Sequence, residues 1–145
     1  MKTHIRRGLS VIAGLVAGFI VISIVEGASS LIFPPPAGLD LNDQQALRDF
    51  IQGLPAGALL FVLLAHILGS FIAGFACVAV SGEGWRPGAL VVGVIVLAGG
   101  VFNLVAIPHP VWFAIADVAI YIPAAYLGGH FAVRYKRQPS ARTNT

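Results

Sequence analysis

The chain has 145 residues, of which 57% are hydrophobic and only 10% are charged, whereas about a quarter of the residues in a typical soluble domain are charged. So little charge cannot cover a water-exposed surface, and the composition therefore excludes a soluble globular protein. The formal net charge of +3 does not indicate a nucleic-acid partner, because the basic residues lie at the ends of apolar segments, where they orient membrane helices.

Four apolar segments follow one another along the chain, over residues 8–33, 56–80, 88–107 and 111–133. Each is long enough to cross about 30 Å of hydrocarbon as a helix. Unpaired backbone groups are costly in lipid, and the alternating pattern of barrel strands is absent, so the segments should be helical. The sequence predicts a single all-α integral membrane domain, a four-helix bundle, followed by a disordered cytoplasmic tail over residues 138–145.

The basic residues predict an orientation. They gather before the first segment, between the second and third, and after the fourth (Lys2, Arg6, Arg7, Arg86, Arg134, Lys136, Arg137 and Arg142), while Arg48 alone lies in the loop over residues 34–55. The positive-inside rule therefore puts both termini in the cytoplasm and this loop outside. The competing interpretation is a cleaved signal peptide, because residues 1–7 are basic and residues 28–30 are small. The length of the first segment and Glu26 within it favour a retained helix.

The outer loop has a predicted structure of its own. Phe33 and three prolines should end the first helix, and Asn42 with Gln45 resembles a capping box that starts a short helix. One side of this helix is apolar and the other polar, which suits a helix lying flat on the outer membrane surface. The apolar side comprises Ala46, Leu47, Phe50, Ile51 and Leu54.

Small residues recur four positions apart in every segment, which lets helix backbones approach closely in lipid. The pairs are Gly14 with Gly18, Ala65 with Gly69, Ser70 with Gly74, Ala89 with Gly93, and Ala125 with Gly129. They predict packing inside the bundle, and their number suggests that some contact a second copy or another subunit. Pro123, in the middle of the fourth segment, predicts a kink near Tyr121.

Each segment also contains a polar residue in its outer half. At 1.5 Å per residue, the depths from the outer helix ends are roughly 7 Å, 10 Å, 12 Å and 16 Å for Asn103, Asp117, Glu26 and His66. Tyr121 lies one turn below Asp117, and His109 should sit at the mouth. Ionisable groups inside a span are costly unless they find partners, so these six residues form the candidate polar pocket.

Two interpretations of this pocket stay open. In the first, Glu26, His66 and Asp117 bind a cation or pass protons, since histidine titrates in the accessible range. In the second they form a structural network, with Asp117 bonded to His66, Tyr121 adding a donor, and Glu26 protonated or bonded to Asn103.

Metal and cofactor chemistry find little support. Carboxylates and imidazole suit a divalent metal, but no ligand pair has a diagnostic spacing, and the single Cys77 excludes thiolate sites and haem attachment. No nucleophile with a base partner or phosphate-binding glycine loop is present. We therefore expect no catalytic residue, metal or cofactor.

Residues 33–40 (Phe-Pro-Pro-Pro-Ala-Gly-Leu-Asp) and 107–113 (Ile-Pro-His-Pro-Val-Trp-Phe), set among four spans of this order, resemble the corresponding parts of small four-span bacterial inner-membrane proteins of unknown function. The resemblance covers nearly the whole chain. It implies a bacterial inner-membrane location and a shared fold, and it implies no activity.

The leading functional prediction is a non-enzymatic membrane protein that works by association, as a homo-oligomer or as an accessory subunit of a membrane complex. The small-residue pairs motivate it. The alternative is a small proton- or cation-conducting transporter or channel that uses Glu26, His66 and Asp117. A membrane enzyme with an outward-facing metal is the third possibility.

Overall fold

The computed structural model describes residues 2–40, 42–82, 84–107 and 109–137. These residues form five helices and no strand: α1 (Lys2–Ile32), α2 (Gln44–Gly53), α3 (Ala56–Ser81), α4 (Pro87–Ala106) and α5 (Val111–Arg137). The four long helices are each apolar and long enough to cross a membrane. The predicted all-α four-helix bundle with a short helix after the first span is confirmed, and the predicted tail over residues 138–145 lies outside the described residues.

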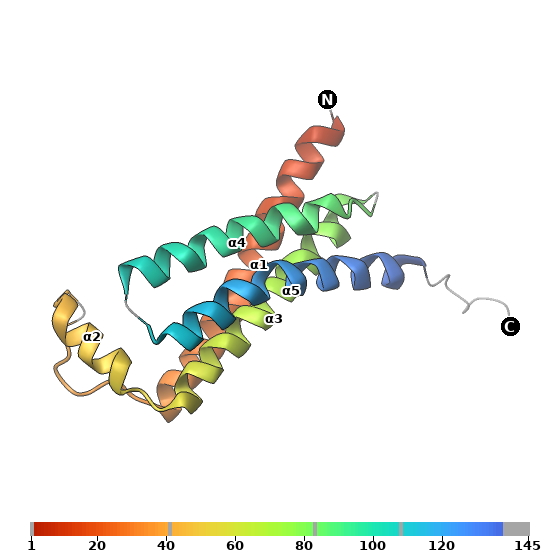
Figure 1. Ribbon diagram of the computed structural model, residues 1–145. Helices are drawn as coiled ribbons and strands as arrows, with labels where there is room; N and C mark the ends of the chain where they lie inside the picture. Colours follow the sequence, from red (N-terminus) through yellow and green to blue (C-terminus); the bar gives the residue numbers. More distant parts are fainter. Residues whose placement is uncertain (1, 41, 83, 108, 138–145) are drawn as a thin grey trace, which may run out of the picture.

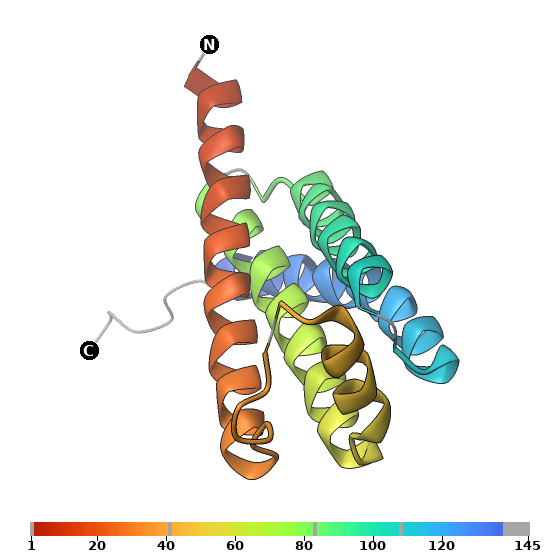
Figure 2. The ribbon, with the colours of Figure 1, turned by 90° about the vertical axis from the view of Figure 1, so that its left-hand side faces the viewer.

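The four long helices pack around α3, as Figures 1 and 2 show. Helix α3 contacts α1 along one side and α5 along another, α4 packs on α5 and α3, and α1 and α4 have the smallest contact of the packed pairs. Helix α2 lies where α1 ends and α3 begins (Figure 1). We call this the loop end, and the end with the N-terminus and the α3–α4 turn the terminal end.

Small residues determine how closely the helices approach. A Cβ atom built on Gly14 would lie 2.6 Å from the backbone oxygen of Ala73, and one built on Gly18 would lie 2.7 Å from that of Gly69. Between α3 and α5, a Cβ on Gly128 would overlap the backbone oxygen of Phe71. Helix backbones can come this close only where the residues in contact are glycines or have very small side chains.

All five predicted small-residue pairs are used inside the chain. The α1 pair faces α3, and Gly69 faces Ile22 of α1. Gly74 faces Ala125, while Gly93 and Gly129 lie between α4 and α5. The pairs therefore hold this one bundle together, and none of them is left as a surface for a second copy.

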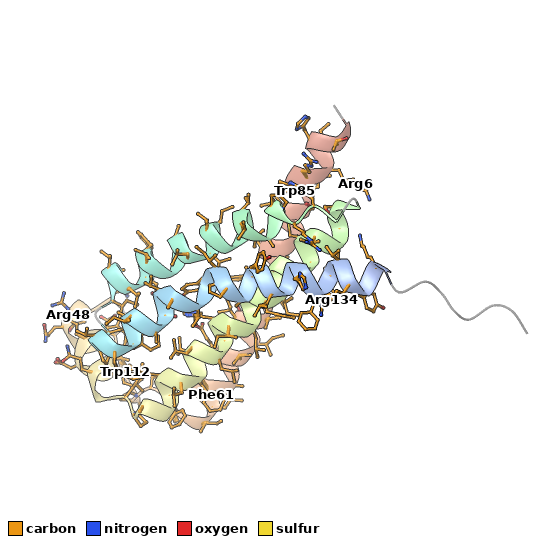
Figure 3. All side chains as sticks on the ribbon, turned by 45° about the vertical axis from the view of Figure 1, so that its right-hand side comes forward. Arg6, Arg48, Phe61, Trp85, Trp112 and Arg134 are labelled. Carbon is orange, nitrogen blue, oxygen red and sulfur yellow. The ribbon has the colours of Figure 1, made fainter. Side chains whose placement is uncertain are left out.

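The large apolar side chains point away from these contacts. Phe19 is 70% exposed, Phe102 76% and Val105 80%. In water such surfaces would aggregate, but in lipid they face hydrocarbon, where helices need no polar side. Figure 3 shows Trp85 and Trp112 at opposite ends of the bundle, which suits aromatic anchors at two interfaces.

Helix α2 begins differently from the prediction. Asp43, and not Asn42, is the N-cap: its side chain accepts hydrogen bonds from the backbone N–H groups of Gln45 at 2.9 Å and Ala46 at 3.2 Å. The Asn42 amide instead donates to Asp40. A carboxylate that meets two unpaired N–H groups of the first turn is the better cap. The predicted two-sided character is confirmed, because Ile51 is buried while Asp43, Arg48, Asp49 and Gln52 are exposed.

Helix α5 continues through Pro123, and Figure 1 shows its axis changing direction part of the way along. Proline removes one backbone hydrogen bond and crowds the preceding turn, which bends a helix without ending it where neighbouring helices hold it. The predicted bend in the fourth span is therefore present, next to the turn that carries Tyr121.

The substitution Gly128→Ala tests the α3–α5 contact. Its methyl group would overlap the Phe71 backbone oxygen, so the helices must separate, and we expect a loss of about 1–3 kcal/mol in the free energy of unfolding. Reversible unfolding in detergent measures it. Gly27→Ala is the matched control, because a Cβ there meets nothing within 4 Å. Equal stability of the two variants would contradict the packing described.

Candidate functional site

His66 of α3 lies at the centre of a group of polar side chains from three helices. Its Nδ1 atom is 2.6 Å from Oδ1 of Asp117. The Tyr121 hydroxyl donates to Oδ2 of the same carboxylate at 2.9 Å and also lies 2.9 Å from His66 Nδ1. Asp117 and Tyr121 are four residues apart on α5 and so share one face of that helix.

The other nitrogen of His66 faces α1. Its Nε2 atom is 3.5 Å from Oε1 of Glu26, so the imidazole ring stands between two carboxylates and links α1 to α5 through α3. Only the doubly protonated ring can donate to both carboxylates, because a neutral imidazole carries one N–H. We call Glu26, His66, Asp117 and Tyr121 the polar cluster.

Exposure falls steeply across the polar cluster. The Glu26 side chain is 43% exposed, that of His66 9% and that of Asp117 2%, and Tyr121 as a whole residue is 1% exposed. A buried carboxylate is costly unless charge and hydrogen bonds compensate it. Asp117 receives both, from the Tyr121 hydroxyl and from His66 when the ring is protonated. The cluster therefore joins an accessible carboxylate to an inaccessible one.

Two cavities flank the polar cluster. The first, which we call the loop-end cavity, has a volume of about 280 Å³ and lies between α1, α2 and the start of α3, with Glu26, Ser29 and Ser30 in its wall. The second, which we call the lateral cavity, has a volume of about 370 Å³ and lies between α1 and α4, with His66, Tyr121 and Asn103 among its lining residues. Glu26 and His66 thus border different cavities.

The bundle closes toward the terminal end. Ala73, Cys77 and Val92 form a fully buried apolar group there, and Val78 with Ala89, Ala132 and Val133 forms a second. Between these groups and the polar cluster lies Ser70, whose buried hydroxyl has no hydrogen-bond partner among the described residues. Cys77 is fully buried and packs as an apolar residue in the first of these groups.

Four of the six predicted pocket residues meet, and two do not join them. Asn103 is exposed on α4 at the lateral cavity, and no hydrogen bond of its side chain occurs within the described part of the chain. Of the two alternatives given for Glu26, the bond to Asn103 does not occur among the described residues, where Glu26 lies beside His66 instead. His109 stacks on Phe113 with ring centres 4.9 Å apart and contacts the Ile107 carbonyl oxygen.

The prediction of a pocket missed the space beside the polar cluster. Gly99 and Gly100 line the lateral cavity on α4; a Cβ on Gly99 would enter open space, whereas Gly100 is packed against the Tyr121 hydroxyl group. The signal in the sequence was this adjacent pair of glycines. Gly99 and Gly100 precede Asn103 by four and three residues, so all three lie on one side of the helix.

The polar cluster is poorly arranged to hold a metal ion. His66 directs Nδ1 to one carboxylate and Nε2 to the other, so its donors do not converge with both carboxylates on one point. Across residues 2–40, 42–82, 84–107 and 109–137 no group of three or more His, Cys, Asp or Glu side chains is suited to a metal. The geometry of the polar cluster instead suits proton exchange between neighbouring side chains.

A double-mutant cycle measures the bond at the centre of the cluster. We expect His66→Ala and Asp117→Ala to show a coupling of about 0.5–3 kcal/mol in the free energy of unfolding, because each removes the partner of the other. The cycle of His66→Ala with Glu26→Ala should give a smaller coupling, since that contact is longer and half open. Purely additive effects of the first pair would show that the contact is not formed.

Comparisons with known proteins identify no relative of this chain. The chain matches no protein-family model, no curated protein and no solved structure. What it does must therefore be inferred from its own residues and their geometry.

Proposed function

We propose that the protein is a small proton transporter of a bacterial inner membrane, in which His66 passes protons between Glu26 and the buried Asp117. The observation that carries the proposal is the imidazole ring held between a half-exposed and a fully buried carboxylate, one at each nitrogen. Imidazole is the side chain that ordinarily gains and loses a proton between pH 5 and 8.

The transfer uses both nitrogens of the ring. Glu26 gives a proton to Nε2, the ring releases the proton on Nδ1 to Asp117, and Tyr121 holds the Asp117 carboxyl group in place. The ring is then neutral with its proton on Nε2. Before the next transfer the ring has to move that proton to the Nδ1 side, by rotation or by exchange, and Asp117 has to release its proton toward the terminal end.

The charged residues support an orientation for this transfer. Arg6 and Arg134 lie at the terminal end and Arg48 at the loop end (Figure 3). Arg86 precedes α4 at the terminal end, and Asp40, Asp43 and Asp49 lie near Arg48 in the sequence. By the positive-inside rule both termini lie in the cytoplasm and the loop end lies outside. The resemblance to four-span bacterial proteins supports a location in the bacterial inner membrane. Glu26 would then receive protons from the outer side, through the loop-end cavity.

The closed terminal half favours a carrier over an open channel. On the terminal side of His66, one face of α3 carries the buried hydroxyl groups of Ser70 and Ser81, and the apolar group around Cys77 separates them. Water must enter before protons can follow it. The bend at Pro123 lies beside Tyr121 and is the place where α5 can pivot to admit water.

Association is the second candidate, and it supplements transport. The small-residue pairs that suggested it are filled by helices of the same chain, so they no longer argue for a partner. What favours a second copy is size, because four helices enclose little pathway, and a homo-oligomer or a membrane-protein partner would complete one.

Proton flux into liposomes tests the proposal. Purified protein should acidify vesicles when a membrane potential drives protons inward, and Glu26→Gln, His66→Gln and Asp117→Asn should each lower the rate at least tenfold, because none of the new side chains can carry the proton. Asp49→Asn is the matched control, since Asp49 is an exposed carboxylate of α2 and should leave the rate unchanged. Absence of wild-type flux, or flux retained in all three variants, overturns the proposal.

Cysteine labelling tests the access route and the orientation. In a Cys77→Ser background, we expect Glu26→Cys to react with a membrane-impermeant thiol reagent added outside intact cells, because its side chain borders the loop-end cavity. Asp117→Cys should stay unlabelled, because that position is 1% exposed. Labelling of position 26 only from the cytoplasmic side of inverted vesicles would reverse the orientation.

A further inference from the structure

The lateral cavity has the composition of a ligand site. Most of its lining is apolar, with Phe19 and Ile22 on α1 facing Ile95 on α4, and a few polar groups stand at defined places. Small-molecule sites combine an apolar wall with a few polar groups, at volumes of about 300–1,000 Å³. The cavity, at about 370 Å³, falls within this range.

The mouth of the cavity lies between helices and faces the hydrocarbon. Phe19 is 70% exposed and Ile95 is 43% exposed, so the side chains on its two rims belong to the lipid-facing surface. Helices α1 and α4 have the smallest contact of all packed pairs, and Figure 2 shows them diverging. A molecule dissolved in the bilayer can therefore reach the cavity sideways.

Two glycines of α4 shape this space: Gly99 leaves it open, and Gly100 lets Tyr121 come close. A Cβ on Gly99 would meet nothing within 4 Å, whereas a Cβ on Gly100 would overlap the Tyr121 hydroxyl group. Gly99 lies between Ile95 and Asn103 on one side of the helix, since residues four apart are neighbours there. The cavity thus exists because α4 has no side chain where it passes the polar cluster.

The polar groups of the cavity select an uncharged head group. Asn103 offers both an amide donor and a carbonyl acceptor, and its side chain has no hydrogen bond within the described part of the chain. The rings of His66 and Tyr121, 5.2 Å apart, form the inner wall. No Asp, Glu, Lys or Arg side chain of the described residues lines the cavity, so a charged head group would leave water for an apolar mouth that offers no counter-ion.

We propose that the lateral cavity binds a lipid-soluble molecule with a compact, uncharged, hydrogen-bonding head group, of the kind found in a benzoquinone ring. The ring lies beside His66 and Tyr121, Asn103 donates a hydrogen bond to a ring oxygen, and the apolar tail leaves between α1 and α4. The proposal concerns binding alone and does not depend on proton transport.

Binding of two probes tests the proposal. Calorimetric titration of the protein in phosphatidylcholine nanodiscs, with the signal of empty nanodiscs subtracted, should show saturable binding of a decyl-substituted benzoquinone. Decylbenzene, which has the same tail and no polar oxygen, should bind at least tenfold more weakly. Equal binding of the two probes would mean that the cavity accepts acyl chains only, and would overturn the assignment of a polar head group.

Three variants locate the bound probe. Gly99→Leu should abolish quinone binding by filling the cavity, and Asn103→Ala should weaken it about tenfold through the lost hydrogen bond. Ala98→Leu is the matched control, because Ala98 is exposed on α4 and does not line the cavity. Unchanged binding in Gly99→Leu would overturn the site.

A fourth variant separates this inference from the proposed transport. Glu26 borders the loop-end cavity and does not line the lateral one, so Glu26→Gln should keep its affinity for the quinone while it loses proton flux. A protein that binds the quinone and conducts no protons would uphold this inference and contradict only the transport proposal. The reverse result would contradict only this inference.

Discussion

The close contact between the backbones of α3 and α5 positions everything else in this protein. Gly74 meets Ala125 and Gly128 meets Phe71, and the two helices run in the same direction from the loop end (Figure 1). His66 precedes Gly74 by about two turns, as Asp117 precedes Ala125. The glycine contact therefore brings the imidazole and the carboxylate to the same level and within hydrogen-bond distance.

Side-chain size then divides the bundle into two halves. Toward the terminal end the buried residues are small, such as Ala73 and Ala89, and the helices close on one another. Beside the polar cluster, Phe19 and Ile22 of α1 line one side of the lateral cavity, and Gly99 of α4 leaves the other side unfilled. Lipid supplies no hydrophobic force to collapse such a gap, so the shape of the contacting surfaces decides where helices touch.

The difference between the closed terminal half and the open half around the polar cluster bears on the proposed function. An ionisable group in a membrane interior needs a partner, and the cluster provides one for each member while leaving Glu26 half open. A network that served only to hold helices together would gain nothing from an accessible carboxylate or from Ser70, buried without a partner among the described residues. Both features suit groups that exchange protons, and the adjoining lateral cavity lets a membrane-soluble molecule approach the same imidazole.

The sequence by itself determined the four long apolar helices and the level of each polar residue along them, because hydrophobic length and a rise of about 1.5 Å per residue depend only on local order. It also placed His66, Asp117 and Tyr121 at matching levels. It did not determine the helix ends, since Asp43 caps α2 and α1 begins at Lys2. Depth does not specify rotation about the helix axis, so the sequence could not show that Asn103 turns to the lateral cavity or that Glu26 faces His66. Only the tertiary structure decided this, because rotation follows from which small residues of different helices meet, and those residues lie far apart along the chain.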